Sequence, residues 1–277
     1  MPEKIAVELG PVQETLLIPL LGRAEETKKG RGIIEDRKAV EIVATLDYDF
    51  SKWQGIPSLA GASIRTRMFD DEVAEFLSQH PDGTIVEIGA GLNTRFERLD
   101  NGRAHWVEID LPDTMVLRRQ FFSDSERRHM LSASVLESDW YEKVKSYSSP
   151  YCFVSEAVII YLQEADAERA LSAMAANFPG AWLIMDTTAK ALVENQQKHD
   201  AMKKLARDSW FRWGCDDPGK LGDWGLQLKH AHTFMDVSPE IRKKLPLSVR
   251  FLLRIFPWLV KRRVRGYYIN RFELFQP

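Results

Sequence analysis

The sequence predicts an α/β fold with a mainly parallel, seven-stranded sheet, an N-terminal helical cap and C-terminal additions. Short β-branched or apolar runs alternate with helical patterns between residues 81 and 190, which is the order of parallel strands joined by right-handed crossovers. The first run ends in a glycine-rich turn, and the run at 181–185 (AWLIM) is apolar throughout. An all-apolar strand is typical of a sheet that is covered on both faces.

Local patterns give the expected elements. Helices are expected at 111–122, with a proline in the first turn, and around 167–178, which ends in a Phe-Pro-Gly stop. Strands are expected at 84–88, 104–109, 131–135, 151–155, 181–185, 226–234 and 267–275, the last two as an antiparallel pair. We therefore expect one domain over 1–277. A helical cap or lid (1–80) precedes the core (81–190), and 191–277 add substrate-side helices, a tryptophan-rich loop and the last strands.

Composition narrows the class of protein. The chain has 277 residues, 44% of them hydrophobic, and its net charge of −2 gives no reason to expect a nucleic-acid partner. Its two cysteines, Cys152 and Cys215, form no disulfide framework and show no metal-ligand spacing, so no metal is expected. The first ten residues do not resemble a signal peptide, and no apolar run is long enough for a transmembrane helix. A cytoplasmic protein is expected.

The turn after the first strand is a candidate ligand site, because open α/β sheets bind ligands beyond the carboxyl ends of their strands. Gly89 and Gly91 permit a tight turn. Asp110 follows Gly91 by 19 positions, and an acid at that distance can accept hydrogen bonds from both hydroxyls of a ribose. Thr94 breaks the dinucleotide fingerprint at its third glycine. A nucleoside without phosphates, such as S-adenosylmethionine, needs only the two glycines and the acid; a plain turn beside a surface aspartate is the alternative.

The amino-acid part of that nucleoside makes two further demands. Its ammonium can be received by Glu87, directly or through water. Its carboxylate would be received by a nearby arginine, preferably as a fork.

The wording of the motifs is more specific than their spacing. VEIGAGLNTRFERLDNG, followed by HWVEIDLP, resembles the leucine carboxyl methyltransferase family, and within it the tetracenomycin-type polyketide O-methyltransferases. ASIRTRMFDD, SASVLESDW, FVSEAVIIYL and FPGAWLIMDTTA match further segments of that branch in order, so the resemblance covers nearly the whole chain. It implies a Rossmann-like class I methyltransferase that uses S-adenosyl-L-methionine and acts on a small-molecule acceptor.

The resemblance also implies roles for particular residues. Arg65 would bind the methionine carboxylate of the cofactor, with Arg67 as the alternate to it, and Glu156 would lie beside the methionine part and the transferred methyl group. The remaining implied contacts are Gly89 with the cofactor, Gly91 in the same turn, Asp110 with the ribose, and Ser134 and Val135 with the adenine.

Two positions depart from the pattern of the branch. Asn93 replaces the usual aspartate, so it keeps a hydrogen-bonding oxygen but loses the charge. Ala157 stands where glycine is common.

Aromatic residues and histidines supply the remaining candidates. Trp210, Trp213 and Trp224 fall in a glycine-rich stretch and can form a substrate wall or simply pack. Tyr161, His230 and His232 are weak candidates for a catalytic base. The two histidines are expected to point to opposite faces of their strand, so that at most one of them faces the cleft.

The segment 241–265 is basic, with apolar residues between the charges. It can be a membrane-surface helix or a docking site for an acidic partner. Pro257 interrupts the pattern and favours a helix that packs on the domain with a solvated basic face.

These observations predict an O-methyltransferase that modifies a carboxylate or phenol of a secondary metabolite. A carboxylate is ionised at neutral pH and needs no base, whereas a phenol gains from one. Since no base is convincingly placed, carboxyl methylation is favoured weakly. The alternatives are methylation of the C-terminal carboxylate of a peptide or protein, and a silent cofactor-binding partner protein, for which Asn93 is the only hint.

Overall fold

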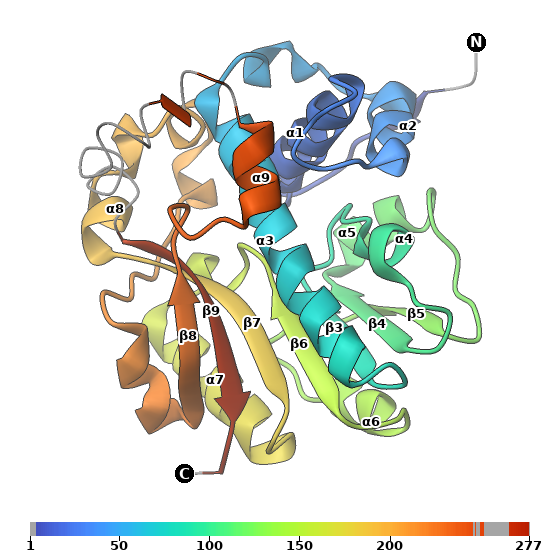
Figure 1. The fold of residues 1–277 in the computed structure, drawn as a ribbon, viewed down its shortest axis with the longest axis vertical. Helices are drawn as coiled ribbons and strands as arrows, with labels where there is room; N and C mark the ends of the chain where they lie inside the picture. Colours follow the sequence, from blue (N-terminus) through green and yellow to red (C-terminus); the bar gives the residue numbers. More distant parts are fainter. Residues whose placement is uncertain (1–3, 246, 248–249, 252–265, 277) are drawn as a thin grey trace.

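The computed structural model describes residues 4–245, 247, 250–251 and 266–276. A seven-stranded sheet forms its centre, in the order β5-β4-β3-β6-β7-β9-β8 (Figure 1). Neighbouring strands are parallel except for β9, which runs antiparallel to both β7 and β8. The strands are β3 (Thr84–Ile88), β4 (His105–Asp110), β5 (Arg128–Ser132), β6 (Tyr151–Ser155), β7 (Trp182–Thr188), β8 (Leu226–His232) and β9 (Tyr267–Leu274).

The predicted strands all occur, and β3 and β6 have the expected bounds. The largest difference is at β5, which begins three residues before the expected strand at 131 and ends at Ser132. Arg128 starts it and is buried because its guanidinium binds Glu108 of β4, with Nε 3.0 Å from Oε2. A search for apolar runs misses a strand that opens on a buried ion pair.

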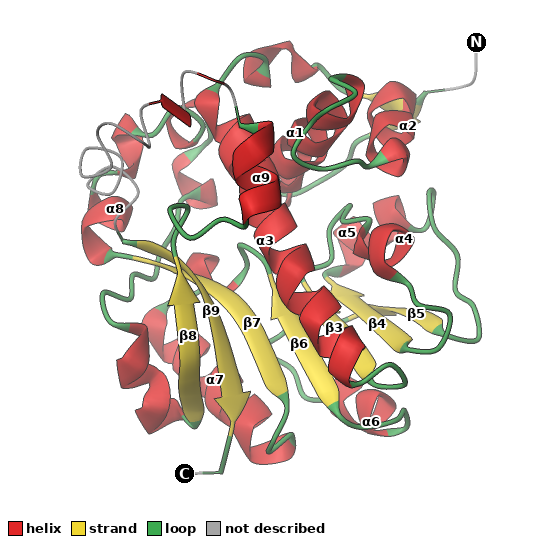
Figure 2. Cartoon of the chain, in the orientation of Figure 1, coloured by secondary structure: helices red, strands yellow, loops and turns green. Residues whose placement is uncertain are grey.

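Helices cover both faces of the sheet (Figure 2). On one face lies the long helix α3 (Pro57–Gln79), whose Phe69, Val73 and Phe76 are fully buried. On the other face, α7 (Glu164–Asn177) buries Leu171 and Met174 in a separate cluster. The remaining core helices are α4 (Arg95–Leu99), α5 (Pro112–Arg118), shorter than the expected 111–122, and α6 (Trp140–Lys145).

The cap consists of α1 (Leu17–Lys28), α2 (Arg37–Thr45) and a short parallel pair of strands, β1 (Ile5–Ala6) and β2 (Leu46–Asp47). It lies beside the first half of α3, near the carboxyl ends of the parallel strands (Figure 1). A Cβ at Gly22 of α1 would lie 2.7 Å from the carbonyl oxygen of Leu59. The absence of a side chain there lets α1 approach α3 closely.

After β7 the chain forms α8 (Lys190–Glu194), several short 3₁₀ helices that include Pro218–Trp224, and α9 (Pro239–Lys244). Ile241 of α9 is buried in the cluster beneath α3, whereas most of the basic segment 241–265 lies outside the described residues. Across the described part of the chain, no helix combines the length and apolar character needed to span a bilayer.

Candidate active site

The turn after β3 depends on two glycines with positive φ, Gly89 at +66° and Gly91 at +51°. The amides of Gly89 and Ala90 both donate to the carbonyl of Ile109, at 2.8 and 3.0 Å, which fixes the turn to β4. A Cβ at Gly89 would lie 2.3 Å from Cγ2 of Val158. Position 89 therefore excludes a side chain by both its dihedral angles and its surroundings.

Asp110 faces this turn from the end of β4. Its Oδ2 accepts the amide of Gly91 at 2.6 Å, and its Oδ1 accepts the amide of Leu111 at 2.7 Å. Burial raises the pKa of Asp110, and the two amide donors oppose that shift. The carboxylate predicted from spacing is thus held against the predicted turn, at the carboxyl edge of the sheet where such ligands bind.

A cavity with an empty volume of about 400 Å³ opens beside the turn. We call it the turn cavity. The cap closes one side of it, and buried ionic side chains form the other. Its lining residues include Leu16, Pro19, Arg23, Arg65, Glu87, Gly89, Asn93, Arg95 and Glu156. Asp110, Ser134 and Val135 are not among the lining residues.

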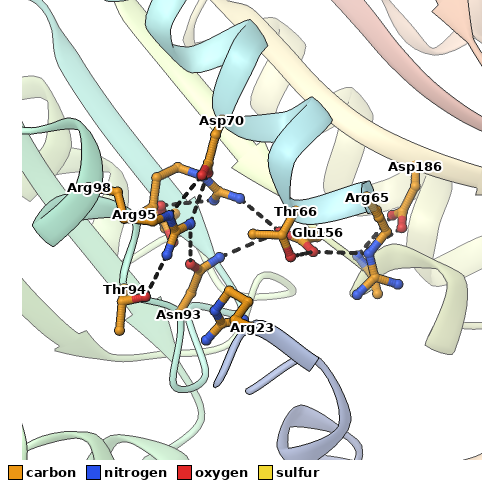
Figure 3. A network of polar contacts seen from close by, with 12 residues as sticks. Arg23, Arg65, Thr66, Asp70, Asn93, Thr94, Arg95, Arg98, Glu156 and Asp186 are labelled. Atoms are coloured by element: carbon orange, nitrogen blue, oxygen red, sulfur yellow. Dashed lines mark hydrogen bonds and ion pairs between the residues drawn. The ribbon is translucent and has the colours of Figure 1, made fainter. Parts of the chain in front are cut away.

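Glu156 is the centre of the ionic wall (Figure 3). It follows β6 and accepts hydrogen bonds from Arg65 Nε at 3.0 Å, Thr66 Oγ1 at 2.7 Å and Arg95 Nη2 at 2.7 Å. Burial alone would raise the pKa of Glu156, but the two guanidinium groups prevail and lower it to about 2. The carboxylate is therefore ionised at any physiological pH.

Arg65 reaches this wall from α3, and its role as a cofactor ligand stays a prediction. Its Nη1 lies 3.3 Å from the hydroxyl of Tyr267, which in turn binds Asp186 of β7. The alternate residue, Arg67, pairs instead with Asp71 one helical turn away, at 2.8 Å. Of the two arginines, only Arg65 lines the turn cavity.

Glu87, which was expected to receive the ammonium group of the cofactor, also lines the turn cavity, and its hydrogen-bond partner in the structure is Arg95. Its Oε1 accepts a hydrogen bond from Arg95 Nη1 at 2.9 Å. Burial raises the pKa of Glu87, and the charge of Arg95 acts against that shift.

Ser134 and Val135 lie in the loop after β5. The amide of Ala133 donates to the carbonyl of Asp110 at 2.9 Å, so the loop runs next to the carboxylate proposed for the ribose. The side chain of Val135 packs in the core with Trp140. Their contact with an adenine stays a prediction.

The three tryptophans do not form a single wall. Trp213 and Trp224 stack, with ring centroids 5.6 Å apart, and line a second cavity together with Lys190, Cys215 and Leu221. We call it the tryptophan cavity; its empty volume is about 690 Å³. Trp210 lies elsewhere, where its indole donates to the carbonyl of Met202 at 3.0 Å beneath the cap.

The expectation that His230 and His232 point to opposite faces is wrong. Their ring centroids are 4.4 Å apart, and both rings face Glu72 of α3. The physical reason is that side chains alternate along a strand with period two, so residues 230 and 232 share a face. Neither histidine lines the turn cavity.

These histidines and Glu72 offer three donor atoms within 4.8 Å of one another, an arrangement that can hold a metal. Arg271 occupies part of this group: its Nη1 is 3.5 Å from Glu72 Oε2, and its Nη2 is 3.3 Å from His230 Nδ1. These contacts form a polar network that joins α3 to β8 and β9.

Tyr161 ends the short 3₁₀ helix Ile159–Tyr161 and packs edge-on against Phe211, with centroids 5.2 Å apart. Burial raises the pKa of its phenol. A phenolate base at neutral pH is therefore not favoured at this position.

Sequence reasoning missed three polar members of the site. Arg95 lies inside the quoted glycine-turn motif but received no role. Asp186 follows the apolar run of β7, which is the same kind of signal that selected Asp110 at the end of β4. Tyr267 carries no local signal, because only the pairing of β9 with β7 brings it to Arg65.

Comparison with known proteins agrees with the fold. The family described as leucine carboxyl methyltransferase matches residues 17–175. The chain is 28% identical over 246 residues to the tetracenomycin polyketide synthesis O-methyltransferase TcmP of Streptomyces glaucescens, which covers 87% of this chain and 90% of that one. It is also 28% identical over 205 residues to a putative S-adenosyl-L-methionine-dependent methyltransferase of Parafrankia sp. (strain EAN1pec), covering 68% and 64% of the two chains.

Among solved structures, a duf574 family protein from Streptomyces avermitilis MA-4680 superposes with a TM-score of 0.58 at 12% identity, over 81% of this chain and 87% of that one. At that identity the likeness supports the fold alone. The family match extends over more than half of the residues and includes the glycine turn, Asp110 and Glu156. The chain therefore belongs to the leucine carboxyl methyltransferase family, as its motifs predicted.

Proposed function

We propose that this protein is an S-adenosyl-L-methionine-dependent O-methyltransferase whose acceptor is a small molecule, a carboxylate or phenol of a secondary metabolite. The observation that carries the proposal is the turn cavity, where Arg65, Glu87 and Glu156 lie beside a glycine turn that is bound to Asp110. The names of the two relatives support methyl transfer from S-adenosyl-L-methionine, and one of them supports oxygen of a polyketide as the acceptor atom.

The residues present fit the donor. Asp110 would hold the ribose, and Ser134 and Val135 would lie by the adenine. Among the described residues, none accepts a hydrogen bond from Nη2 of Arg65, so this nitrogen can meet the methionine carboxylate while Nε holds Glu156. Glu87 and Glu156 supply negative charge for the ammonium group.

S-adenosyl-L-methionine supplies a methyl group that is activated by a sulfonium. The protein must hold the acceptor oxygen in line with the methyl carbon and the sulfur that it leaves. Opposite charges neutralise one another during this transfer, so exclusion of water helps. The cap residues Leu16 and Pro19, which close one side of the turn cavity, would provide that exclusion.

Two features of the protein bear on the chemical class of the acceptor. Tyr161, His230 and His232 offer no well-placed base, which favours a carboxylate because it is ionised at neutral pH. The tryptophan cavity presents two indole rings, which suit a planar aromatic molecule. Its charges are mixed, with Lys190 and Lys220 beside Glu164, Asp216 and Asp217. A peptide C-terminus is the second candidate acceptor, since it too is a carboxylate.

Calorimetry with S-adenosyl-L-methionine tests the donor site. We expect binding by the wild type and a loss of about 10- to 100-fold in affinity in Asp110→Ala, because one charged acceptor for two hydroxyls is removed. Asp113→Ala is the matched control, since Asp113 lies on the adjoining helix α5 and its Oδ2 accepts the amide of Gly10 at 3.3 Å. No binding by the wild type would refute the enzymatic proposal.

The product separates the acceptor classes. Mass spectrometry of candidate acceptors should show the gain of one CH₂ group. A product that alkali hydrolyses is an ester and indicates a carboxylate acceptor, whereas an alkali-stable product is an aryl ether. Binding of the donor without turnover on any acceptor would favour the silent partner protein.

A further inference from the structure

Arg95 is a buried cation in the wall of the turn cavity, with 1% of its surface exposed. Three carboxylates surround its guanidinium. Nε binds Asp70 at 2.8 Å, Nη1 binds Glu87 at 2.9 Å and Nη2 binds Glu156 at 2.7 Å. Each nitrogen thus meets a different acid, and the acids come from α3, β3 and the end of β6.

Two of these acids line the turn cavity and the third does not. Glu87 and Glu156 are both lining residues, as is Arg95 itself. Asp70 does not line the cavity. It also binds Arg98, whose Nε is 2.8 Å from Asp70 Oδ2 (Figure 3). Arg95 therefore connects the cavity wall to the ionic network on α3 and α4.

Two carboxylates side by side in a buried wall cannot both stay ionised without a compensating cation. Glu156 has a second cation in Arg65, at 3.0 Å. Among the described residues, the only salt bridge of Glu87 is the one with Arg95. Removal of Arg95 would leave Glu87 without an ion-pair partner and favour protonation of this buried acid.

We infer that Arg95 is a positioning residue that keeps Glu87 and Glu156 ionised and oriented as a paired anionic site for the ammonium group of the cofactor. This inference rests on the proposed function, since it names a partner for one end of the same ligand. Arg95 acts through the two acids, and the end of the ligand that it serves is the amino-acid end, not the nucleoside.

The pKa shifts of the two acids have opposite directions, although Arg95 lowers the pKa of both. The pKa of Glu156 is lowered to about 2 against the effect of burial, with Arg65 and Arg95 as the charges responsible. For Glu87, burial prevails and the pKa is raised, while Arg95 is the strongest group acting against the rise.

The test compares two ligands on the same protein. S-adenosyl-L-methionine carries the ammonium group, whereas 5′-methylthioadenosine has the same nucleoside without the amino-acid part. Calorimetry gives the ratio of their affinities for the wild type, Arg95→Met and Arg95→Lys. A general loss of structure lowers both affinities together and leaves the ratio unchanged.

Arg98→Met is the matched control. Arg98 lies one helical turn from Arg95, exposes 8% of its side chain and also binds Asp70, but its acidic partners are Asp70 and Asp36 and not the acids of the cavity. We expect Arg95→Met to reduce the affinity ratio by about 30-fold, which corresponds to about 2 kcal/mol. Arg98→Met should leave the ratio within about threefold, and Arg95→Lys should fall between the two because it keeps the charge but not the fork.

A second readout is the pH dependence of the ratio. Between pH 8 and pH 6, the ratio should decline more steeply in Arg95→Met than in the wild type, because the acids then take up a proton and lose their attraction for an ammonium. Equal ratios in Arg95→Met and Arg98→Met would overturn the inference. If the wild type binds neither ligand, the proposed function itself fails, which is a different result.

Discussion

Glu156 shows at the level of one residue how a buried charge ties stability to pH. Its pKa in the folded protein is about 2, below the ordinary value of 4.5, because Arg65 and Arg95 outweigh burial. A depressed folded-state pKa contributes stability that is present above the unfolded pKa and is lost as the pH falls toward the folded one. The contribution is therefore complete above about pH 5 and declines toward pH 2.

We accordingly expect Glu156→Gln to lower the free energy of unfolding by about 3 kcal/mol at neutral pH. The difference from the wild type should shrink as the pH falls from 5 to 4, because the wild type then begins to lose the same contribution. Urea unfolding at several pH values measures it. Asp82→Asn, at an exposed ion pair with Arg103, is the control and should change stability little. A difference that does not vary with pH would contradict the assignment.

Gly89 gives a second prediction at the residue scale. An alanine there must adopt a φ of +66° and place Cβ 2.3 Å from Val158. Gly89→Ala should destabilise the fold by about 2–4 kcal/mol. Gly102→Ala, with a φ of +76° but open space around its Cβ, isolates the dihedral strain and should cost about 1 kcal/mol.

Thermal or denaturant unfolding of both glycine variants measures the difference. The double variant Gly89→Ala, Val158→Ala should recover part of the loss, because it removes the clash and leaves the dihedral strain. No recovery would mean that Val158 is not what position 89 avoids.

At the scale of elements, α3 belongs to the cap and the core at once. Pro57 begins it beside the cap, Arg65 reaches the turn cavity from its middle, and Phe76 packs on the sheet near its end. In the sequence, a helical face is recognisable only at the last turns of α3, where Val73, Phe76 and Leu77 share one side. The remainder is hidden because the first half carries buried small and polar residues that pack against α1.

The crossing of α1 and α3 yields a prediction with opposite signs at two glycines. Gly22→Ala would place Cβ 2.7 Å from the Leu59 carbonyl, and we expect a loss of about 1–3 kcal/mol from forced separation of the helices. Gly61→Ala, inside α3 with open space around its Cβ, should instead stabilise by about 0.5–1 kcal/mol through helix propensity. Denaturant unfolding of the two variants measures these changes in stability. A gain in stability at both positions would contradict the close approach of α1 to α3.

At the scale of the whole molecule, buried ion pairs fasten the cap to the core. Asp36 caps α2 by accepting the amide of Ala39 at 2.9 Å, and its other oxygen binds Arg23 of α1 at 2.8 Å and Arg98 of α4 at 3.2 Å. Arg23 also donates to the carbonyl of Leu92 beside the glycine turn, at 2.7 Å. The carboxylate thus connects both cap helices to the segment that surrounds the turn cavity.

Asp36→Asn keeps an acceptor for the helix cap but removes the charge opposite two arginines. We expect a loss of about 3 kcal/mol in stability and faster hydrogen exchange over residues 17–45 than over the core strands. Glu35→Gln, at an exposed pair with Arg37, is the neighbouring control. Uniformly faster exchange throughout the chain would show that the cap does not open separately.

The strands themselves, the glycine turn and the place of Asp110 beside it were open to prediction from the sequence, because each depends on local patterns. Period-two and all-apolar runs specify strands, only glycine suits the backbone of the turn, and an acid at a strand end reaches the ligand edge of a parallel sheet. Motif wording added Arg65 and Glu156 and identified the family. Where a local rule was misapplied, as for His230 and His232, the prediction failed.

Other features were decided only by the tertiary structure. The contact of Arg95 with three acids and the approach of Tyr267 to Arg65 join segments distant in the chain. Trp210 and Trp213, only three residues apart, pack into different clusters. Such contacts depend on which helix crosses which strand and at what depth, and no local periodicity encodes them. Buried charged residues are especially hard to predict from sequence. An arginine is expected at the surface unless acidic partners pair with it in the interior, and only the tertiary structure shows those partners.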